Sequence, residues 1–324
     1  MNFGTFLGVN GNRLIVKEAD GRTWETLLSR LRTIRIAKKG ISVSSNLVIA
    51  CASRGIRLYF VDWQGIAVAA VSGLHNHAVV NVRKAQFKNL QTAIAFDISK
   101  EIVRSKIKNQ RAVLLYYNKY LSKTDNNLSL QLTSAADKLN RHIDSLKGIG
   151  LSSLWRETLM GVEGAAAATY WESLVNAKLL PAGFVKREGR GSKELTNICF
   201  NYGYAILQSY CWSALDNAGF ELYAGFLHAD RPGKPSLVLD FMEEYRAWVV
   251  DRNIIKIRNK IAKAKSFDLN LKSTITEMIG ECLSGTIVYK RKRIKLENLM
   301  QRQAYRLAGS LIGEKSYKGI RFKW

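Results

Sequence analysis

Residues 94–114 read IAFDISKEIVRSKIKNQRAVL, and this stretch decides the fold class of the chain. Its aliphatic side chains recur mostly four positions apart, with lysine and arginine between them, at Ile94, Ile98, Ile102, Val103, Ile107 and Leu114. Such spacing places the aliphatic side chains on one face of an α-helix and the basic side chains on the other. The stretch therefore predicts a long amphipathic helix, and the change to a helical period begins at about residue 79.

The chain beyond this helix keeps the helical period almost to its end. A polar tract, Lys123–Asn127, interrupts the pattern, and a basic segment, Val288–Lys295, precedes the last helix. Further helices are expected around Leu130–Leu146, Ser152–Leu179, Glu194–Ala218, Leu237–Lys265, Ser273–Cys282 and Leu296–Leu311. Only 3 prolines occur in 324 residues, which agrees with long uninterrupted helices because proline breaks them.

The first seventy or so residues read instead as a small sheet domain. Short runs bounded by Gly, Asn, Asp or Lys predict strands at 14–16, 33–36, 41–43, 56–61 and 66–71, with a turn at 62–65. Ser44 or Ser45 is expected to cap one helix over Asn46–Arg54, which Gly55 ends. The predicted class is α+β: a small N-terminal β-rich domain with one short helix (1–72), a linker (73–79) and a larger all-α helical catalytic domain (80–324).

Charge indicates the kind of partner. The chain has 50 Lys+Arg against 26 Asp+Glu, a net charge of +24. An excess of this size calls for a polyanion, and nucleic acid is favoured over a membrane surface because the basic residues spread along the whole chain. The N-terminus does not resemble a signal peptide, and no apolar run is long enough to span a membrane. We therefore expect a cytoplasmic, DNA-associated protein with no membrane partner.

The four cysteines do not indicate a zinc site or a disulfide framework. They are widely separated, and none forms a C-x-x-C pair: Cys51, Cys199, Cys211 and Cys282. A structural zinc needs clustered ligands. Four reduced, buried thiols are expected instead.

Candidate chemistry comes from a few acids and one histidine. Glu163 is a lone carboxylate among small residues of a predicted helix, and His228 precedes a stiff turn that holds two of the three prolines. After that turn Ser236 is placed to cap a helix on which Asp240 and Glu243 share one face. A histidine and carboxylates from separate helices suit Mg²⁺ or Mn²⁺ and, in a basic protein, phosphodiester chemistry. The alternative, left open here, is a solvated Glu163 and an ordinary acidic face balanced by Arg246.

Two other motifs are weaker. His75-Asn76-His77 spells the letters of a nuclease motif, but those residues are consecutive here, so this segment is interpreted as linker. The run Lys290-Arg291-Lys292-Arg293 is typical of a solvated charged surface, and in this protein it is also a candidate for contact with DNA phosphates.

Five segments, in order, resemble the Cas-one family of CRISPR-associated integrases, also described as endonucleases. They are the strand–helix–strand run Ile41–Val61, the helix segment Ile102–Gln110, Leu159–Gly164 with Tyr170-Trp171 (GxEG…YW), Asn197–Leu207 (NICFNYGYAIL) and Gly225–Arg246 (H…RPG…SL…D..E..R). The resemblance implies a dimerising N-terminal β-domain, an all-α catalytic domain, and a homodimer that docks on the small Cas-two protein. It further implies metal-dependent insertion of short DNA into a CRISPR array.

The resemblance also implies the site. Its metal ligands, an acid, a histidine and an acid, match Glu163, His228 and Glu243, with Mg²⁺ or Mn²⁺ as the cofactor. Asp240 matches a further acidic catalytic position, either as an alternate ligand or behind the ligands. Basic residues where the family carries them, or within its last signature, are the expected DNA contacts: Lys186, Arg187, Arg190, Lys193, Arg231, Lys234 and Arg246.

The leading hypothesis is thus a DNA integrase and endonuclease in which a 3′-hydroxyl attacks a phosphodiester. Two alternatives stay open at this point. One is the integrase of a Cas-one-related mobile element, which differs in its target. The other is a non-catalytic DNA-binding scaffold that uses the same basic surface.

Overall fold

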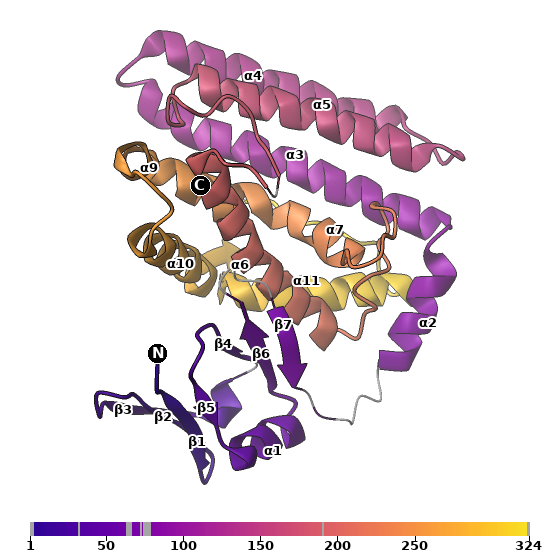
Figure 1. Cartoon of the computed structure of the whole chain (residues 1–324). Helices are drawn as coiled ribbons and strands as arrows, with labels where there is room; N and C mark the ends of the chain where they lie inside the picture. The colour runs from indigo at the N-terminus through magenta and orange to yellow at the C-terminus, as the bar shows by residue number, and fades with distance from the viewer. Residues whose placement is uncertain are drawn as a thin grey trace. The chain divides into compact units, whose positions relative to one another are not determined.

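A computed structural model of the chain describes residues 3–31, 33–62, 67–71, 73, 79–189 and 191–322. The chain divides into two compact units, Met1–Ala78 and Val79–Trp324, and each is described by itself. Figure 1 labels their helices and strands. No helix within the described residues is both long and apolar enough to cross a membrane.

The first unit contains two small sheets and one helix. One sheet has the order β3-β2-β1-β5, with strands β1 (Phe6–Asn10), β2 (Arg13–Lys17), β3 (Thr23–Leu27) and β5 (Ser42–Val43). The other has the order β4-β6-β7, with β4 (Thr33–Ile36), β6 (Arg57–Val61) and β7 (Ala67–Val71). Helix α1 (Ser45–Ser53) connects them in sequence, and the short 3-10 turn η1 (Leu28–Arg30) follows β3.

Local chemistry explains the helix of this unit. The Ser44 hydroxyl accepts a hydrogen bond from the Leu47 amide, so Ser44 is the N-cap, and Gly55 takes the left-handed conformation (φ +67°) just after the helix. Leu7, Leu47 and Leu58 are fully buried in its core. Strands β1 and β3 were not predicted from the sequence, and most of the predicted turn at 62–65 lies outside the described residues.

The second unit is mostly helical, as predicted. Its helices are α2 (Val79–Asn89), α3 (Ala93–Leu121), α4 (Asn126–Ser145), α5 (Trp155–Asn176), α6 (Leu195–Asn217), α7 (Ser236–Tyr245), α8 (Arg252–Lys256), α9 (Arg258–Lys263), α10 (Leu269–Ser284) and α11 (Leu296–Leu311). A 3-10 turn, η2, spans Leu146–Gly148. The α+β class is confirmed, and one two-stranded hairpin, β8 (Thr286–Tyr289) and β9 (Lys292–Lys295), interrupts the helices.

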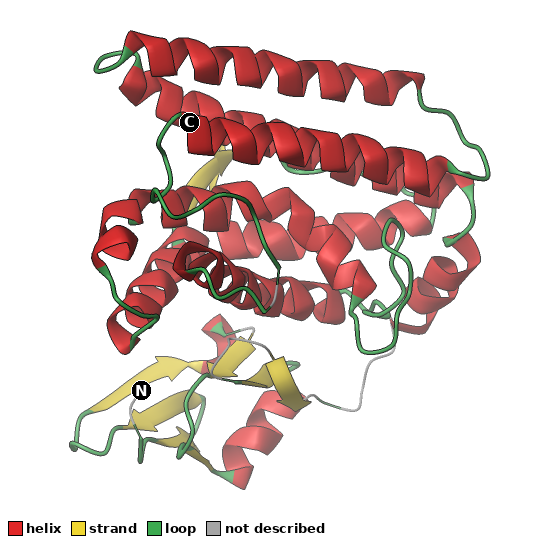
Figure 2. Cartoon of the chain, turned by 45° about the horizontal axis from the view of Figure 1, so that its top comes forward, coloured by secondary structure: helices red, strands yellow, loops and turns green. Residues whose placement is uncertain are grey.

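Helix α3 organises this unit. It packs against α4 and α5, and the three helices lie side by side in Figures 1 and 2. Its other contacts include α7 and the π-helical segment η3 (Arg246–Asp251). The long apolar stripe predicted from residues 94–114 is thus buried on several sides, and α3 lies between the helices that carry the candidate acids.

Three local predictions are corrected. The single helix expected over Leu237–Lys265 is divided into α7, η3, α8 and α9, and the wider π turn ends at Asp251, which accepts hydrogen bonds from two tyrosines. The basic segment Val288–Lys295 forms most of the β8–β9 hairpin. Ser236 does not cap α7; it is the first helical residue, and its hydroxyl donates to the Ala229 carbonyl instead (3.0 Å).

Residues 317–322 bind α7 to α3 as a strap. The Tyr317 hydroxyl and the Ile320 amide both donate to the Glu244 carboxylate, and the Phe322 amide donates to the Asn109 side chain. Asn109 in turn donates to the Glu244 carbonyl at 2.7 Å. Burial raises the pKa of Glu244 to about 7, because the hydrogen bonds to its carboxylate only partly offset the loss of water.

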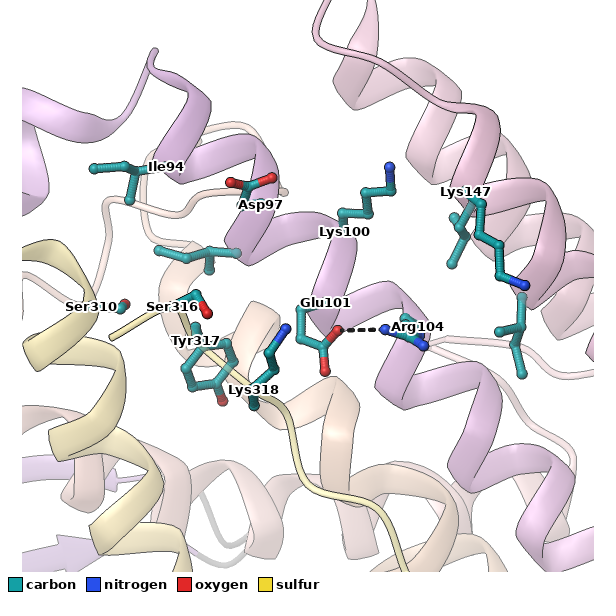
Figure 3. A pocket seen from close by; sticks show the side chains of 13 residues that line it. Ile94, Asp97, Lys100, Glu101, Arg104, Lys147, Ser310, Ser316, Tyr317 and Lys318 are labelled. Carbon is teal, nitrogen blue, oxygen red and sulfur yellow. Dashed lines mark hydrogen bonds and ion pairs between the residues drawn. The ribbon is translucent and has the colours of Figure 1, made fainter. Parts of the chain in front are cut away.

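The strap also borders a cavity in the unit. This cavity of about 440 Å³ lies between the first half of α3, the end of α4 and residues 316–318, with an ion pair between Glu101 and Arg104 on its wall (Figure 3). It does not contain any of the predicted metal ligands. Charge on its rim is mixed, since Asp97 and Glu101 oppose four lysines and arginines.

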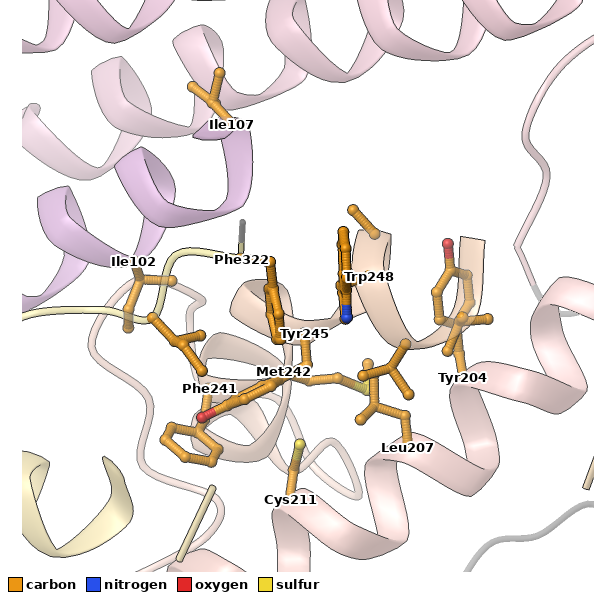
Figure 4. Close-up of a cluster of buried hydrophobic side chains, with 14 of the residues drawn as sticks. Ile102, Ile107, Tyr204, Leu207, Cys211, Phe241, Met242, Tyr245, Trp248 and Phe322 are labelled. Atoms are coloured by element: carbon orange, nitrogen blue, oxygen red, sulfur yellow. The ribbon is translucent and has the colours of Figure 1, made fainter. Parts of the chain in front are cut away.

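Aromatic and aliphatic side chains fill the space beneath α7 (Figure 4). Phe322 of the strap stacks on Trp248 with ring centroids 5.1 Å apart and planes 7° apart. Phe241 and Tyr245, both on α7, pack against each other with ring centroids 5.4 Å apart. These contacts fix the rotation of α7 and therefore the direction of its acidic face.

Cys199 and Cys211 are buried as expected, as is Cys51 in the first unit, whereas Cys282 is only partly buried; all are free thiols.

Candidate active site

The structure brings the predicted acids together around a lysine. Glu163 comes from α5 and Glu243 from α7, and the Lys106 ammonium of α3 makes ion pairs with both carboxylates. The distance from Lys106 Nζ to Glu243 Oε2 is 2.7 Å. Three helices that are distant in sequence therefore converge on one charged cluster, and of these three side chains Lys106 alone was not singled out from the sequence.

Lys106 is well buried, with 12% of its side chain exposed. Burial alone would lower its pKa, but the charges of Glu243 and Glu163 outweigh burial and raise the pKa. The ammonium is therefore charged, and it occupies the position between two carboxylates where a divalent cation would be held. Its sequence position carried a signal: Lys106 continues the row Ile94, Ile98, Ile102, where an aliphatic residue would be ordinary.

Glu243 has a second cationic neighbour. Arg246 Nε lies 3.0 Å from Glu243 Oε1, and its guanidinium lies 4.8 Å from the ring centroid of Tyr204. Burial alone would raise the pKa of Glu243, but Arg246 and Lys106 together lower it to about 2. Oε2 of this carboxylate is buried and, despite its ion pair with Lys106, makes no hydrogen bond of good geometry. Glu243 is thus an ionised buried carboxylate held between two cations.

The loop before α7 positions His228. Asp240 is fully buried, and its Oδ2 accepts the amides of Phe226 (2.7 Å) and Leu227 (2.9 Å). Its Oδ1 accepts the amide and the ring Nδ1 of His228, at 3.1 and 2.5 Å. Gly225 allows the loop to fold this closely around the Asp240 carboxylate, because a Cβ at position 225 would lie 2.8 Å from the Ser236 Cβ and 2.9 Å from the His228 carbonyl oxygen.

This bonding separates the roles of the two α7 acids. All the hydrogen-bonding directions of Asp240 are used within the protein, so it suits a position behind the ligands. Nε2 of His228 is the ring nitrogen left for a metal. The pKa of His228 is raised: burial acts to lower it, but the hydrogen bond and charge of Asp240 prevail.

The donor set fits a divalent cation in chemistry. Two carboxylates and an imidazole are ligands that Mn²⁺ and Mg²⁺ accept, with water completing the shell. Oε2 of Glu243 is buried and makes no hydrogen bond of good geometry, and it now faces the Lys106 ammonium, so another cation could take the place of that ammonium. As they stand, however, the described residues contain no group of three or more His, Cys, Asp and Glu side chains placed to hold a metal ion. Binding would require Lys106 to leave its position between the acids.

A smaller cavity, of about 180 Å³, opens beside this cluster. Three cationic side chains line it, Lys106, Arg187 and Arg246, together with Gln110 and Asp251. Asp251 accepts hydrogen bonds from the hydroxyls of Tyr170 (3.1 Å) and Tyr204 (2.5 Å). Its pKa is raised to about 6 because burial outweighs those hydrogen bonds. The cavity has the size and charge to accept a phosphate group.

The predicted DNA contacts lie in different surroundings. Lys186, Lys193 and Arg231 are exposed, and Lys234 is half-buried in the turn after His228. Arg187 points inward. Its guanidinium donates to the side-chain oxygens of Asn197 (2.9 Å) and Asn201 (2.6 Å), both on α6. Arg246 belongs to the acid cluster. Arg190 lies outside the described residues.

Comparison with known proteins places this geometry in a family. The family profile described as "CRISPR associated protein Cas1" matches residues 1–278. A curated relative from Francisella tularensis subsp. novicida (strain U112), described as "CRISPR-associated endonuclease Cas1 1", is 44% identical over 99% of this chain and 98% of its own length.

Solved structures share the fold. A casposase bound to integration product superposes with a TM-score of 0.75 at 20% identity, covering 98% of this chain and 90% of the other. A chain of a partial Cas6-RT-Cas1–Cas2 complex superposes with a TM-score of 0.73 at 22% identity, covering 98% and 96%. The profile match and the near-full-length relative together show that the chain belongs to the Cas1 family of CRISPR-associated proteins.

Proposed function

We propose that this protein inserts short duplex DNA into a CRISPR array by divalent-metal-dependent transesterification, and that the same site can hydrolyse DNA. The observation that carries the proposal is the acid cluster itself. Glu163 and Glu243 converge from separate helices beside a histidine fixed by Asp240, in a chain of net charge +24. The name of the 44% identical relative, an endonuclease, agrees with nuclease chemistry.

The chemistry follows from the positions of the side chains. Glu163, Glu243 and Nε2 of His228 would hold Mg²⁺ or Mn²⁺, and a cation held there would supply Lewis-acid polarisation of a phosphoryl oxygen and orientation of the attacking 3′-hydroxyl. Asp240 keeps the proton of His228 on Nδ1, so that Nε2 presents its lone pair.

Two cations complete the site. Arg246 and Lys106 border the small cavity, where fixed positive charge would favour the extra negative charge of the reacting phosphate. Asp240 acts through His228 and is therefore a positioning residue rather than a catalytic residue.

The proposed partners are DNA, a second copy of this chain, and the small Cas2 protein. The basic composition supports DNA. Cas2 is supported by the structural neighbour that was solved as part of a Cas6-RT-Cas1–Cas2 complex, because that neighbour shares the fold of almost the whole chain. We further propose dimerisation through the first unit and a cytoplasmic location with the DNA.

The test is a joining assay. Supercoiled plasmid and a short duplex with free 3′ ends are incubated with the protein and Mn²⁺, with and without Cas2, and covalent joining is scored. The expected result is joined product that disappears in Glu163→Ala and His228→Ala, while both variants still bind duplex DNA. Retained joining by either variant would remove its residue from the site.

The open alternatives give different results in the same assay. A non-catalytic scaffold would bind DNA in a salt-dependent way without any Mn²⁺-dependent product. A mobile-element integrase would join DNA without preference for a plasmid that carries a CRISPR array. The fold likeness to a casposase is compatible with both integrases, so the target preference decides between them.

A further inference from the structure

The β8–β9 hairpin lies between two helices that a shorter link could join. Connections between packed helices commonly have about two to eight residues. Here α10 and α11 are separated by two paired strands, with Thr286 opposite Lys295 and Tyr289 opposite Lys292. The Leu296 amide donates to the Gly285 carbonyl at 3.0 Å and closes the base. The hairpin is therefore an ordered projection.

One face of the hairpin is anchored. Ile294 is buried, and Ile287 and Tyr289 pack against the same core. Arg306 of α11 donates to the Tyr289 hydroxyl at 2.7 Å and lies 5.1 Å from the ring centroid. These contacts hold the hairpin against the helices and fix which residues face outward.

The opposite face and the tip are exposed and strongly basic. Val288 is 75% exposed. Five cationic residues follow within the next seven positions, with no acid among them, and all five are exposed: Lys290, Arg291, Lys292, Arg293 and Lys295. None of the five makes an ion pair with a carboxylate among the residues that the structure describes. Elsewhere in the unit, cations such as Lys106, Lys147 and Arg246 do have acidic partners.

The turn of the hairpin places two cationic residues in a backbone conformation that their side chains disfavour. Lys290 (φ +48°) and Arg291 (φ +64°) form a two-residue turn with both residues in the left-handed region. Such turns strongly prefer Asn-Gly, because residues with long side chains are disfavoured at positive φ. Two cations at the positions that suit them least indicate that something other than folding favours their charge.

We propose that the β8–β9 hairpin is a duplex-DNA contact, which binds the phosphate backbone through Lys290, Arg291 and Arg293. A two-stranded β-ribbon fits the major groove of B-DNA, which is about 12 Å wide. Duplex DNA carries one negative charge per about 1.7 Å of its axis, a density that five neighbouring cations match and a mixed protein surface does not. This inference rests on the proposed function in naming DNA, but it concerns a surface remote in sequence from the acids.

The decisive variant is Lys290→Asn/Arg291→Gly, which removes two charges and installs the preferred turn. Each phosphate contact adds about 0.9 to the slope of log K against log salt, so two contacts are worth roughly 60-fold in affinity at 0.1 M salt relative to 1 M. Duplex binding should weaken by up to that factor, and the slope should fall by about 1.8. The melting temperature should stay the same or rise.

The matched control is Lys138→Gln/Arg141→Gln, two exposed cations of α4 whose loss lowers the net charge equally. It should change the slope much less. The proposal is overturned if both double variants weaken binding alike, if the hairpin variant binds as the wild type does, or if it loses affinity together with melting temperature. Unchanged DNA binding with lost affinity for an acidic protein partner would also overturn it.

Failure of the two proposals can be told apart. Wild-type protein that binds DNA with the predicted hairpin dependence but forms no joined product contradicts the integrase and leaves the hairpin contact standing. Joined product with no hairpin dependence of binding contradicts the hairpin contact alone.

Discussion

His228 donates to Asp240 from two atoms, its backbone amide at 3.1 Å and its ring Nδ1 at 2.5 Å, and both bonds end on the same carboxylate oxygen. The imidazole is therefore fixed in tautomer and in orientation by a residue that is itself fully buried. Two further backbone amides hold the other oxygen of Asp240. Asp240 is therefore the α7 residue that holds residues 226–228 in place.

Asp240→Asn should weaken metal use more than it weakens folding. The amide side chain keeps one acceptor oxygen, but it cannot serve four donors or favour the proton on Nδ1 as a carboxylate does. We expect a loss of about 10–100-fold in apparent Mn²⁺ affinity for strand joining, as for other residues that support metal ligands. A Mn²⁺ titration of joining rate checks this. An unchanged half-maximal Mn²⁺ concentration would contradict the assigned role.

Lys106→Met should make the protein less stable without metal and more responsive to it. Removing one partner of a buried ion pair costs about 3–5 kcal/mol, because Glu163 then loses its cation and Glu243 keeps only Arg246. Mn²⁺ should restore part of that loss, so its addition should raise the melting temperature more in this variant than in the wild type. Thermal melts with and without Mn²⁺ measure both effects.

Lys108→Met is the matched control for that experiment. Lys108 lies two residues along the same helix, and burial and the neighbouring cations Arg321, Arg104 and Lys147 lower its pKa to about 8. Its removal relieves repulsion, so stability should hold or increase, with no change in the Mn²⁺ response. Equal metal responses in the two variants would show that Lys106 does not compete for the metal position.

Asp251 should give the protein a pH-dependent stability between about pH 5 and pH 8. Its folded-state pKa, about 6, lies above its ordinary value of 3.8. The folded state therefore favours the protonated acid, and this stabilisation is complete below pH 4 and lost as the pH rises through 6. Integrated over pH 5 to 8, the loss is about 1 kcal/mol. Asp251→Asn should lack this component.

Urea unfolding of the wild type and of Asp251→Asn at about pH 5 and pH 8 isolates the contribution of Asp251 to the free energy of unfolding. The difference in unfolding free energy between the two proteins should move in favour of the variant as the pH rises. A constant difference across the range would mean that Asp251 is already ionised at pH 5.

Gly203→Ala should destabilise the protein although alanine favours helices. A Cβ at position 203 would lie 2.7 Å from Val250 Cγ1 and 3.2 Å from Ile279 Cδ1, and valine is stiff about χ1. We expect a loss of about 1–3 kcal/mol from overpacking. Gly280→Ala is the control, because nothing lies within 4 Å of its Cβ and helix propensity predicts a gain approaching 1 kcal/mol. Chemical denaturation of both variants should give opposite signs.

Local sequence signals account for much of the fold. The α11 boundaries follow from the apolar period, and Ser44 and Gly55 bound α1 for reasons of capping. The strands β1 and β3 escaped prediction because pairing with β2 holds them, and such pairing is not a local property. The hairpin was missed for a related reason: its turn, Lys290-Arg291, lacks the Asn or Gly that ordinarily signals one.

The candidate site was only half visible in the sequence. Glu163, His228 and Glu243 stood out because of their local sequence context and because they match the family's acid, histidine and acid positions. Lys106 was not singled out: its place in the aliphatic row is unusual, but its role becomes visible only once α3 is known to lie between α5 and α7. Likewise, Tyr317 and Phe322 look like ordinary aromatic residues, and only the tertiary structure places them against Glu244 and Trp248.

The strap also sets an order of events during synthesis on the ribosome. The Ile320 amide, which donates to the Glu244 carboxylate, is synthesised 76 residues later than Glu244. A nascent chain that has already produced all the predicted metal ligands thus still lacks the contacts that hold α7 against α3. A truncated translation product ending before this segment would carry every acid of the site and yet leave them loosely placed. Stable placement of α7 therefore depends on a segment that is synthesised after every predicted metal ligand.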